Sequence, residues 1–96
     1  MVSGYARMNP AAGNDGIAAA IKYFDNCGID AQVYSGGQGL LLNGSRKTFE
    51  SEFDVALREI RVIGEVEKVT YLANQPPSVP EGIQDVVLRT FIPSPV

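Results

Sequence analysis

Cys27 is the one cysteine of the sequence and the first residue to consider for chemistry, because a thiolate can act as a nucleophile. Such a thiolate is usually activated by a nearby base, and the sequence contains no histidine. Cys27 also ends an apolar stripe with helical spacing, and free cysteine is among the most buried residue types. We therefore expect Cys27 to be a buried structural residue, and we predict no catalytic residue.

Three acidic residues, Glu50, Glu52 and Asp54, could together perform acid–base chemistry or bind a hard metal ion. On a helix, however, Glu50 and Asp54 share a face while Glu52 points elsewhere, and no EF-hand spacing surrounds them. Asp54 also precedes Arg58 by four residues, which is the spacing of a solvent-exposed ion pair. The pattern predicts a solvated helix face without a metal site.

Three short motifs are typical of other functions. The glycine-rich "GGQG" at 36–39 resembles a phosphate-binding loop, but it separates two expected strands instead of preceding a helix, so a hairpin turn is predicted. The "NGS" at 43–45 has the glycosylation pattern without a signal peptide, and "PSVP" at 77–80 is a single PxxP. None of the three predicts a cofactor, and none is expected to be functional.

Length and composition favour one small domain spanning residues 1–96, with 45% apolar residues and a net charge of −3. Nucleic-acid binding depends on clustered lysine and arginine, and the 8 basic residues here are scattered, so no nucleic-acid partner is expected. The sequence contains neither a run of about 18 apolar residues nor a signal peptide. We expect an acidic, soluble protein without a membrane partner, either cytoplasmic or part of an assembled particle.

The first half of the chain predicts a helix, a hairpin and a second helix. Residues 14–27 carry an apolar stripe that starts at a capping Asn14 or Asp15 and stops at Gly28. Alternation over 29–34, a glycine-rich turn and "LLLN" predict a β-hairpin. Ser45 is predicted to cap the second helix, whose apolar residues recur at helical intervals. These apolar residues are Phe49, Phe53, Ala56, Leu57 and Ile60.

The second half predicts strands and a short helix. Residues 61–72 favour one strand or, if Gly64 separates two segments, a hairpin, and both possibilities remain open. Ser78 and Glu81 have the spacing of a capping box and predict a short helix. The tail at 91–96 contains two prolines and is expected to be extended.

These elements predict an α+β fold, a ferredoxin-like two-layer sandwich. Two main helices would cover one face of an antiparallel sheet, with the short C-terminal helix beside them and residues 1–13 forming an N-terminal arm or edge strand. The opposite face of the sheet would be free for solvent or a partner.

The run from Gly28 to Ile60, a later tyrosine strand and "SVPEGIQDVV" resemble the activation domain, or prodomain, of sedolisin- and kumamolisin-type serine peptidases. The resemblance covers roughly residues 14–92. The matching positions are Gly28, Gly44, Ser45, Phe53, Leu57 and Pro80. The resemblance implies a ferredoxin-like fold and a role as inhibitor and intramolecular chaperone of a peptidase. The catalytic residues of that peptidase lie in a domain that is not in this sequence. The segment "GEVEKVTYL" is also similar to BON-type bacterial domains.

We therefore predict a non-enzymatic protein-binding module that resembles a protease prodomain and acts as inhibitor or folding chaperone. The alternative is a small assembly subunit of a larger complex such as a virion, for example a decoration, cement or adaptor protein. Either role requires a protein partner, a peptidase or further copies in an assembly. The apolar but proline-interrupted tail is the expected contact, through Phe91, Ile92, Pro93, Pro95 and Val96.

Overall fold

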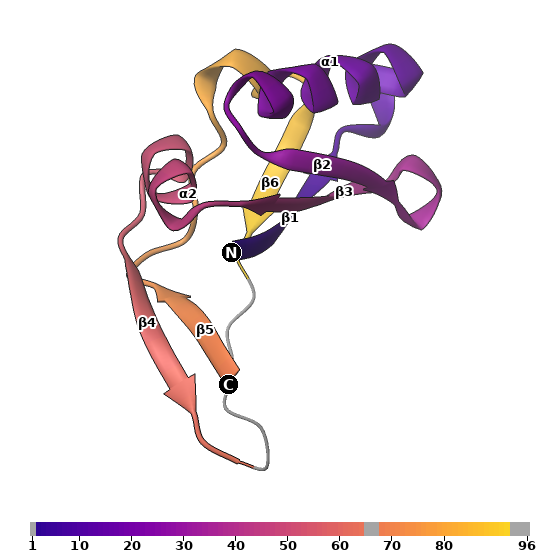
Figure 1. Cartoon of the computed structure of the whole chain (residues 1–96). Coiled ribbons are helices and arrows are strands. Elements are labelled where there is room, and N and C mark those ends of the chain that lie inside the picture. Colours follow the sequence, from indigo (N-terminus) through magenta and orange to yellow (C-terminus); the bar gives the residue numbers. More distant parts are fainter. Residues whose placement is uncertain (1, 65–67, 93–96) are drawn as a thin grey trace.

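Four antiparallel strands form the centre of the molecule, in the order β2-β3-β1-β6 (Figure 1). The computed structural model describes residues 2–64 and 68–92. The strands are β1 (Val2–Met8), β2 (Asp30–Tyr34), β3 (Gly39–Gly44), β4 (Leu57–Val62), β5 (Lys68–Ala73) and β6 (Val87–Phe91). The helices are α1 (Gly13–Asn26) and α2 (Arg46–Phe53), and single 3-10 turns occur at η1 (Pro10–Ala12), η2 (Ser35–Gly37) and η3 (Glu81–Ile83). Within the described residues this is an α+β fold with two α-helices and antiparallel sheets, as the sequence predicted.

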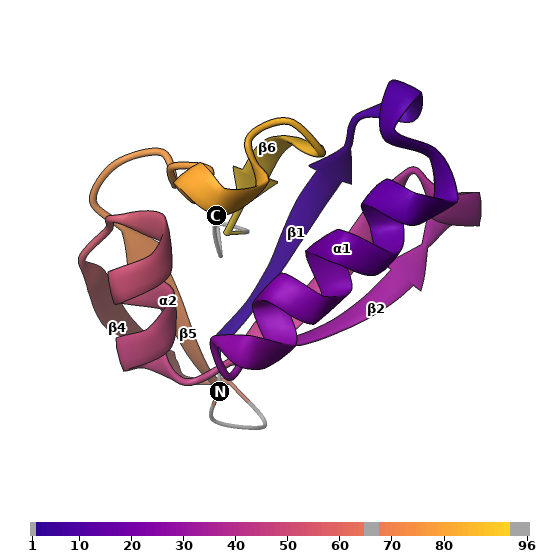
Figure 2. The ribbon, with the colours of Figure 1, turned by 90° about the horizontal axis from the view of Figure 1, so that it is seen from above.

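The helix α1 lies over one face of the four-stranded sheet, and α2 lies beside it, in front of the β4–β5 hairpin (Figure 2). The rings of Phe24 on α1 and Phe53 on α2 lie 6.1 Å apart, and Phe53 contacts Phe49 edge-on at 5.2 Å. The three rings are almost completely buried. Gly4 and Gly44 in the sheet make room for the Phe49 ring, since a Cβ at either position would lie about 3 Å from it. Aromatic side chains over glycines therefore join α2 to the sheet.

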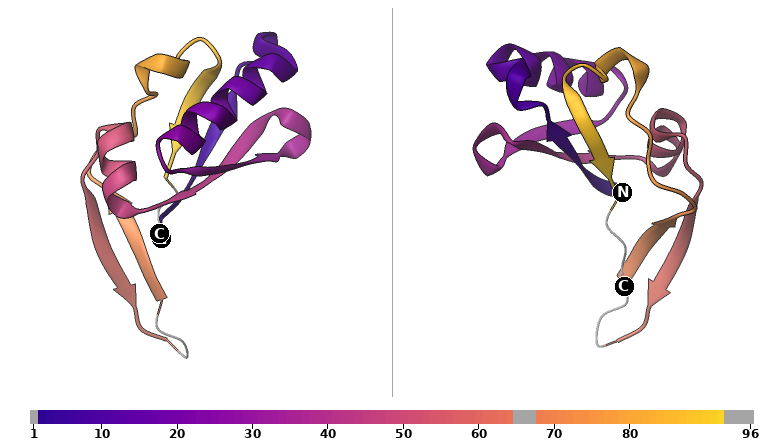
Figure 3. Two further views of the ribbon diagram at one scale, coloured as in Figure 1. Left: turned by 45° about the horizontal axis from the view of Figure 1, so that its top comes forward. Right: turned by 180° about the vertical axis from the view of Figure 1, so that it is seen from behind.

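The hairpin β4–β5 forms a separate two-stranded sheet that projects from the main sheet on the side away from α1 (Figures 1 and 3). Its base is tied to α2, because the backbone N–H of Leu57 donates to Glu50 at 2.8 Å and its carbonyl accepts from Arg46. Leu57 is buried, whereas Ile63 near the far end is 86% exposed. The sequence left one strand or a hairpin open for this region, and the structure shows the hairpin.

The N-terminal segment is a central strand, so its prediction as an arm or edge strand was wrong. β1 pairs with β3 on one side and with β6 on the other. Its side chains alternate between buried and exposed positions, with Val2, Gly4, Ala6 and Met8 on the helix-covered face. The small residues Gly4 and Ala6 weaken the strand signal in the sequence, yet they are what lets the helices approach a central strand.

The second helix is shorter than predicted because it ends at Asp54. This residue adopts the left-handed conformation with φ of 51°, which aspartate tolerates better than most residues, and its N–H donates to the carbonyl of Glu50. Leu57 and Ile60, predicted on the same helical stripe, instead lie in β4. The predicted burial of Phe49 and Phe53 is confirmed.

The predicted short helix after Ser78 is only the 3-10 turn η3, without a side-chain cap. The residues that follow it form β6, which begins with the β-branched Val87 and ends with the aromatic Phe91, and both residue types favour a strand.

In the first half of the chain, α1 starts at Gly13 without a side-chain cap. It ends before Gly28, which has φ of 86° as a helix-terminating glycine requires.

Ser45 begins α2 as predicted, because its Oγ accepts from the backbone N–H of Thr48 at 3.2 Å. We expect Ser45→Ala to lower the free energy of unfolding by about 1 kcal/mol, the usual contribution of such a cap. Urea denaturation would measure it. A loss several times larger would show that Ser45 supports more than the helix end.

Candidate protein-binding surface

The face of the four-stranded sheet opposite the helices carries no layer of secondary structure among the described residues (Figures 1 and 3). We call this surface the open face. Strand register arranges its side chains in three rows that cross the sheet. These rows are Asp30–Asn43–Ser3, then Gln32–Leu41–Tyr5–Phe91, then Tyr34–Gly39–Arg7–Arg89.

Three aromatic residues from three different strands dominate the open face. Tyr5 lies directly across from Phe91, and the rings of Tyr5 and Tyr34 are 5.9 Å apart. Their exposed fractions are 38% for Tyr5, 46% for Tyr34 and 37% for Phe91. Aromatic rings that are neither buried nor isolated are typical of protein interfaces, where they supply much of the binding free energy. The open face therefore has the composition of a binding surface.

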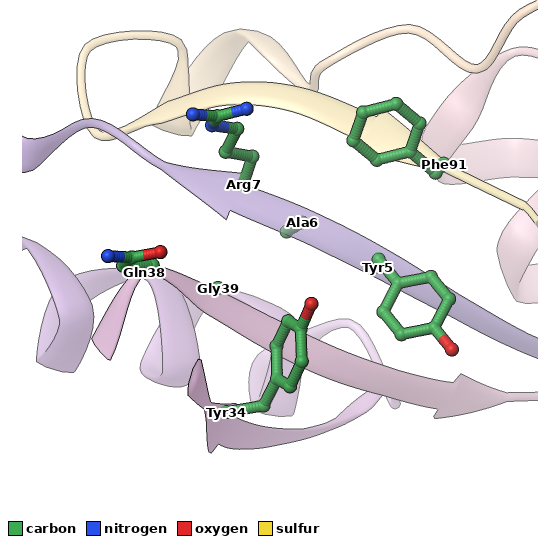
Figure 4. Close-up of a pocket in the computed structure, with 7 residues that line it drawn as sticks. All are labelled: Tyr5, Ala6, Arg7, Tyr34, Gln38, Gly39 and Phe91. Carbon is green, nitrogen blue, oxygen red and sulfur yellow. The ribbon is translucent and has the colours of Figure 1, made fainter. Parts of the chain in front are cut away.

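Gly39 on β3 lies between Tyr34 and Arg7 and leaves room for the Tyr34 ring to extend across the sheet. Gly39 and Tyr34 are cross-strand partners, and a Cβ on Gly39 would approach the Tyr34 ring to 2.9 Å and the Ala6 carbonyl to 3.1 Å. Figure 4 shows the Tyr34 ring over β3 beside Gly39. Glycine at this position is thus required by the position of the aromatic ring.

A shallow pocket of about 360 Å³ is formed between these side chains (Figure 4). Its walls are Tyr5, Ala6, Arg7, Tyr34, Gln38, Gly39 and Phe91. The rings provide apolar walls, while Arg7 and Gln38 provide polar groups at one end. Apolar walls with a few placed polar groups are the usual composition of a binding pocket.

A second pocket, of about 500 Å³, lies where the hairpin joins α2 and includes Arg46 and Arg58. Arg46 is already engaged in the fold: it donates to the Leu57 carbonyl, lies 3.7 Å from Glu50 and stacks 5.8 Å from the centre of the Tyr71 ring. This pocket is therefore part of the joint between hairpin and body.

Cys27 is half-buried, so the prediction of full burial was wrong, and it lies near Tyr23 and Glu52. The Tyr23 hydroxyl donates to Glu52 at 3.0 Å and so links α1 to α2. Burial raises the pKa of the Cys27 thiol, and the negative charge of Glu52 adds to this effect. A raised pKa lowers the thiolate fraction, which disfavours nucleophilic chemistry at Cys27.

Burial also raises the pKa of Tyr23 from 10.0 to about 12, with the hydrogen bond to Glu52 as second cause. Because the folded state favours the protonated phenol, this contribution to stability is complete below pH 10 and is lost as the pH rises toward 12. We expect wild type to be more stable than Tyr23→Phe near neutral pH, and the difference to shrink above pH 10. Urea denaturation of both proteins across this range measures it; a difference that does not change with pH would contradict the assignment.

The acidic residues have separate structural roles. Glu50 accepts from the Leu57 N–H, Glu52 from Tyr23, and Asp54 ends α2. Within residues 2–64 and 68–92, no three histidine, cysteine or acidic side chains are placed to hold a metal ion. The "GGQG" segment overlaps the turn η2, with positive φ at Gly36 and Gly37, and leads into β3, so it forms the predicted hairpin turn.

Two of the five residues predicted as the contact tail belong to the described structure. Phe91 is the last residue of β6 and belongs to the open face, and Ile92 packs partly against the core. Pro93, Pro95 and Val96 lie outside the described residues. The prediction that the extended tail starts at residue 91 was wrong, because Phe91 pairs with Tyr5 in the sheet.

Sequence reasoning anticipated a free sheet face but named only Phe91 among the residues that form the aromatic cluster. Tyr5 and Tyr34 are 29 positions apart in the chain, and the rest of the cluster comes from β6. The available signal was the alternation over Val2–Met8, which places Tyr5 and Arg7 on the same side.

None of the helices in the described part of the chain is long and apolar enough to span a membrane. Comparisons of the chain with models of protein families, with curated proteins and with solved structures gave no match.

Proposed function

We propose that this chain is a protein-binding module that acts as an inhibitor or folding chaperone of a serine peptidase, in the manner of sedolisin- and kumamolisin-type prodomains. The open face supports this proposal, because Tyr5, Tyr34 and Phe91 surround a pocket there and each is more than one third exposed. A rigid sheet that presents partly exposed aromatic rings is suited to a protein partner.

The strand order supports a ferredoxin-like assignment within this proposal. In chain order β1, α1, β2, β3, α2 and β6 give the β-α-β-β-α-β arrangement, with the β4–β5 hairpin inserted after α2. The positions that resemble the prodomain family have defined roles here. Gly28 ends α1, Ser45 begins α2, and Phe53 and Leu57 are buried.

We propose further that the chain is not an enzyme. Cys27 has a raised pKa and no histidine exists to activate it. The expected outcome of broad hydrolase, transferase and redox assays is no turnover. A reproducible activity that Cys27→Ser abolishes would contradict this part of the proposal.

The test of the proposed function is inhibition of a mature sedolisin-type peptidase from which its own prodomain has been removed. We expect the chain to inhibit it with a dissociation constant of about 1 µM or lower, equivalent to roughly 8 kcal/mol. A parallel refolding assay of the denatured peptidase would detect chaperone activity. Absence of both effects would overturn the proposal.

The second candidate is an assembly subunit, favoured by the outer edges of β2 and β6, which pair with no further strand among the described residues, and by the separate two-stranded sheet of the hairpin. Strand edges associate through backbone hydrogen bonds whatever the sequence of the partner. Sedimentation over a range of concentrations distinguishes the two candidates, since an assembly subunit should form larger species without any peptidase.

A further inference from the structure

One corner of the open face carries two arginines in directly opposite positions on adjacent strands. Arg7 on β1 is the cross-strand partner of Arg89 on β6. Both residues are exposed, and their register with the neighbouring pair Tyr5–Phe91 places them on the open face. Figure 4 shows Arg7 extending from β1 toward β6. Like charges in opposite positions on a sheet are destabilising, so this pair lowers the stability of the free domain.

The fold does not compensate these charges within the described residues. The ion pairs found there involve Arg46 with Glu50 and Arg61 with Glu59, and neither is on the open face. Arg89 lies over the Phe91 ring at 4.8 Å, which leaves its guanidinium N–H groups available. The acid of the open face, Asp30, is in the opposite row of the sheet, two rows from Arg7.

The arginine pair borders the aromatic pocket, since Arg7 is itself part of its wall. A ligand at this corner would meet two guanidinium groups beside an apolar hollow. Guanidinium groups bind carboxylates in bidentate geometry, and two of them beside each other can share one carboxylate or hold two. The net charge of −3 on the whole chain makes this positive corner a local exception.

We infer that Arg7 and Arg89 bind an aspartate or glutamate side chain of the protein partner, with an adjoining apolar side chain of that partner seated in the pocket. This rests on the proposed function for the identity of the partner as a peptidase. Such a contact would fix the orientation of the complex, because the remaining acidic surface repels acidic groups elsewhere. Neutralising the arginine pair would also remove the repulsion present in the free domain.

The first test uses the peptidase and the double variant Arg7→Gln/Arg89→Gln. We expect its affinity to fall at least tenfold, as is usual when a charged hydrogen bond is lost from an interface. The matched control is Lys47→Gln/Arg58→Gln, which removes the same charge from exposed positions off the open face. This control should change affinity by less than about threefold. Equal losses in the two variants, or no loss in either, would overturn the inference.

The second test needs no peptidase. The backbone amide NMR signals of the chain are followed while the peptide acetyl-Leu-Glu-Leu-Asp-amide is added, and separately its Gln and Asn counterpart. We expect the acidic peptide to shift Arg7, Gly39 and Arg89, the neutral peptide to act far more weakly, and the double variant to lose the response. Equal responses to both peptides, or an equal response to inorganic phosphate, would overturn carboxylate recognition.

A stability measurement tests the repulsion between the two arginines. Arg7→Gln, which leaves the contact of Arg89 with the Phe91 ring in place, should raise the urea midpoint of the free domain at low salt, and added salt should narrow the gap to wild type. A lower midpoint would contradict the opposed-charge account. Selective binding of the acidic peptide without peptidase inhibition would overturn the proposed function alone, whereas inhibition that is insensitive to the arginine pair would overturn this inference alone.

Discussion

Replacing Phe53 with alanine is expected to bring the domain close to unfolding. The side chain is 1% exposed and touches both Phe24 and Phe49, so that its removal empties the space between α1, α2 and the sheet. Large-to-small substitution of a buried phenylalanine costs about 3–5 kcal/mol, and a domain of this size has about 5–10 kcal/mol in total. Urea denaturation would measure the loss, with Ser45→Ala as a mild variant in the same helix.

The same experiment distinguishes a core residue from an interface residue. A Phe53→Ala protein with wild-type stability but no peptidase binding would show that α2 is an exposed interface. The burial of Phe53 against Phe24 and Phe49 favours the stability effect.

Removing the two tyrosine rings of the open face is expected to weaken binding to the peptidase. Tyr5 and Tyr34 contact each other across the open face while more than one third of each remains exposed. Aromatic residues at the centre of an interface typically contribute about 2–4 kcal/mol each when truncated. We expect Tyr5→Ser/Tyr34→Ser to weaken peptidase binding at least a hundredfold, about 2.7 kcal/mol, with the fold retained because neither ring is part of the core. Circular dichroism and urea denaturation would confirm that it is retained.

Local sequence signals predicted those elements whose pattern has one interpretation. The stripe in α1 has helical period only, Gly28 supplies the positive φ that ends it, and alternation with a glycine turn fixes the β2–β3 hairpin. Ser45 caps α2 through a contact three residues away. In each case the determining interactions lie within a few positions along the chain.

The predictions that were wrong concern segments whose local sequence pattern fits two different structures. Residues 55–60 match a continued helix and a strand equally well, and the choice is made by Asp54 in the left-handed conformation and by the pairing of β4 with β5. Prolines at 93 and 95 made Phe91 resemble a tail residue, although its pairing with Tyr5 places it in β6. Strand neighbours and register are long-range properties, so the central position of β1 and the rows of the open face could not be derived from the sequence.

Binding of the partner protein at the open face can be tested by comparing dissociation constants. Wild type, Tyr5→Ser/Tyr34→Ser and the control Ile63→Ser/Val69→Ser would be titrated against the same mature peptidase. The control removes two exposed apolar side chains from the hairpin region, where Ile63 is 86% and Val69 47% exposed. If the open face binds the partner, affinity should fall at least about a hundredfold for the open-face variant and less than about threefold for the control. Wild-type affinity in the open-face variant, with a large loss in the control, would contradict binding at the open face.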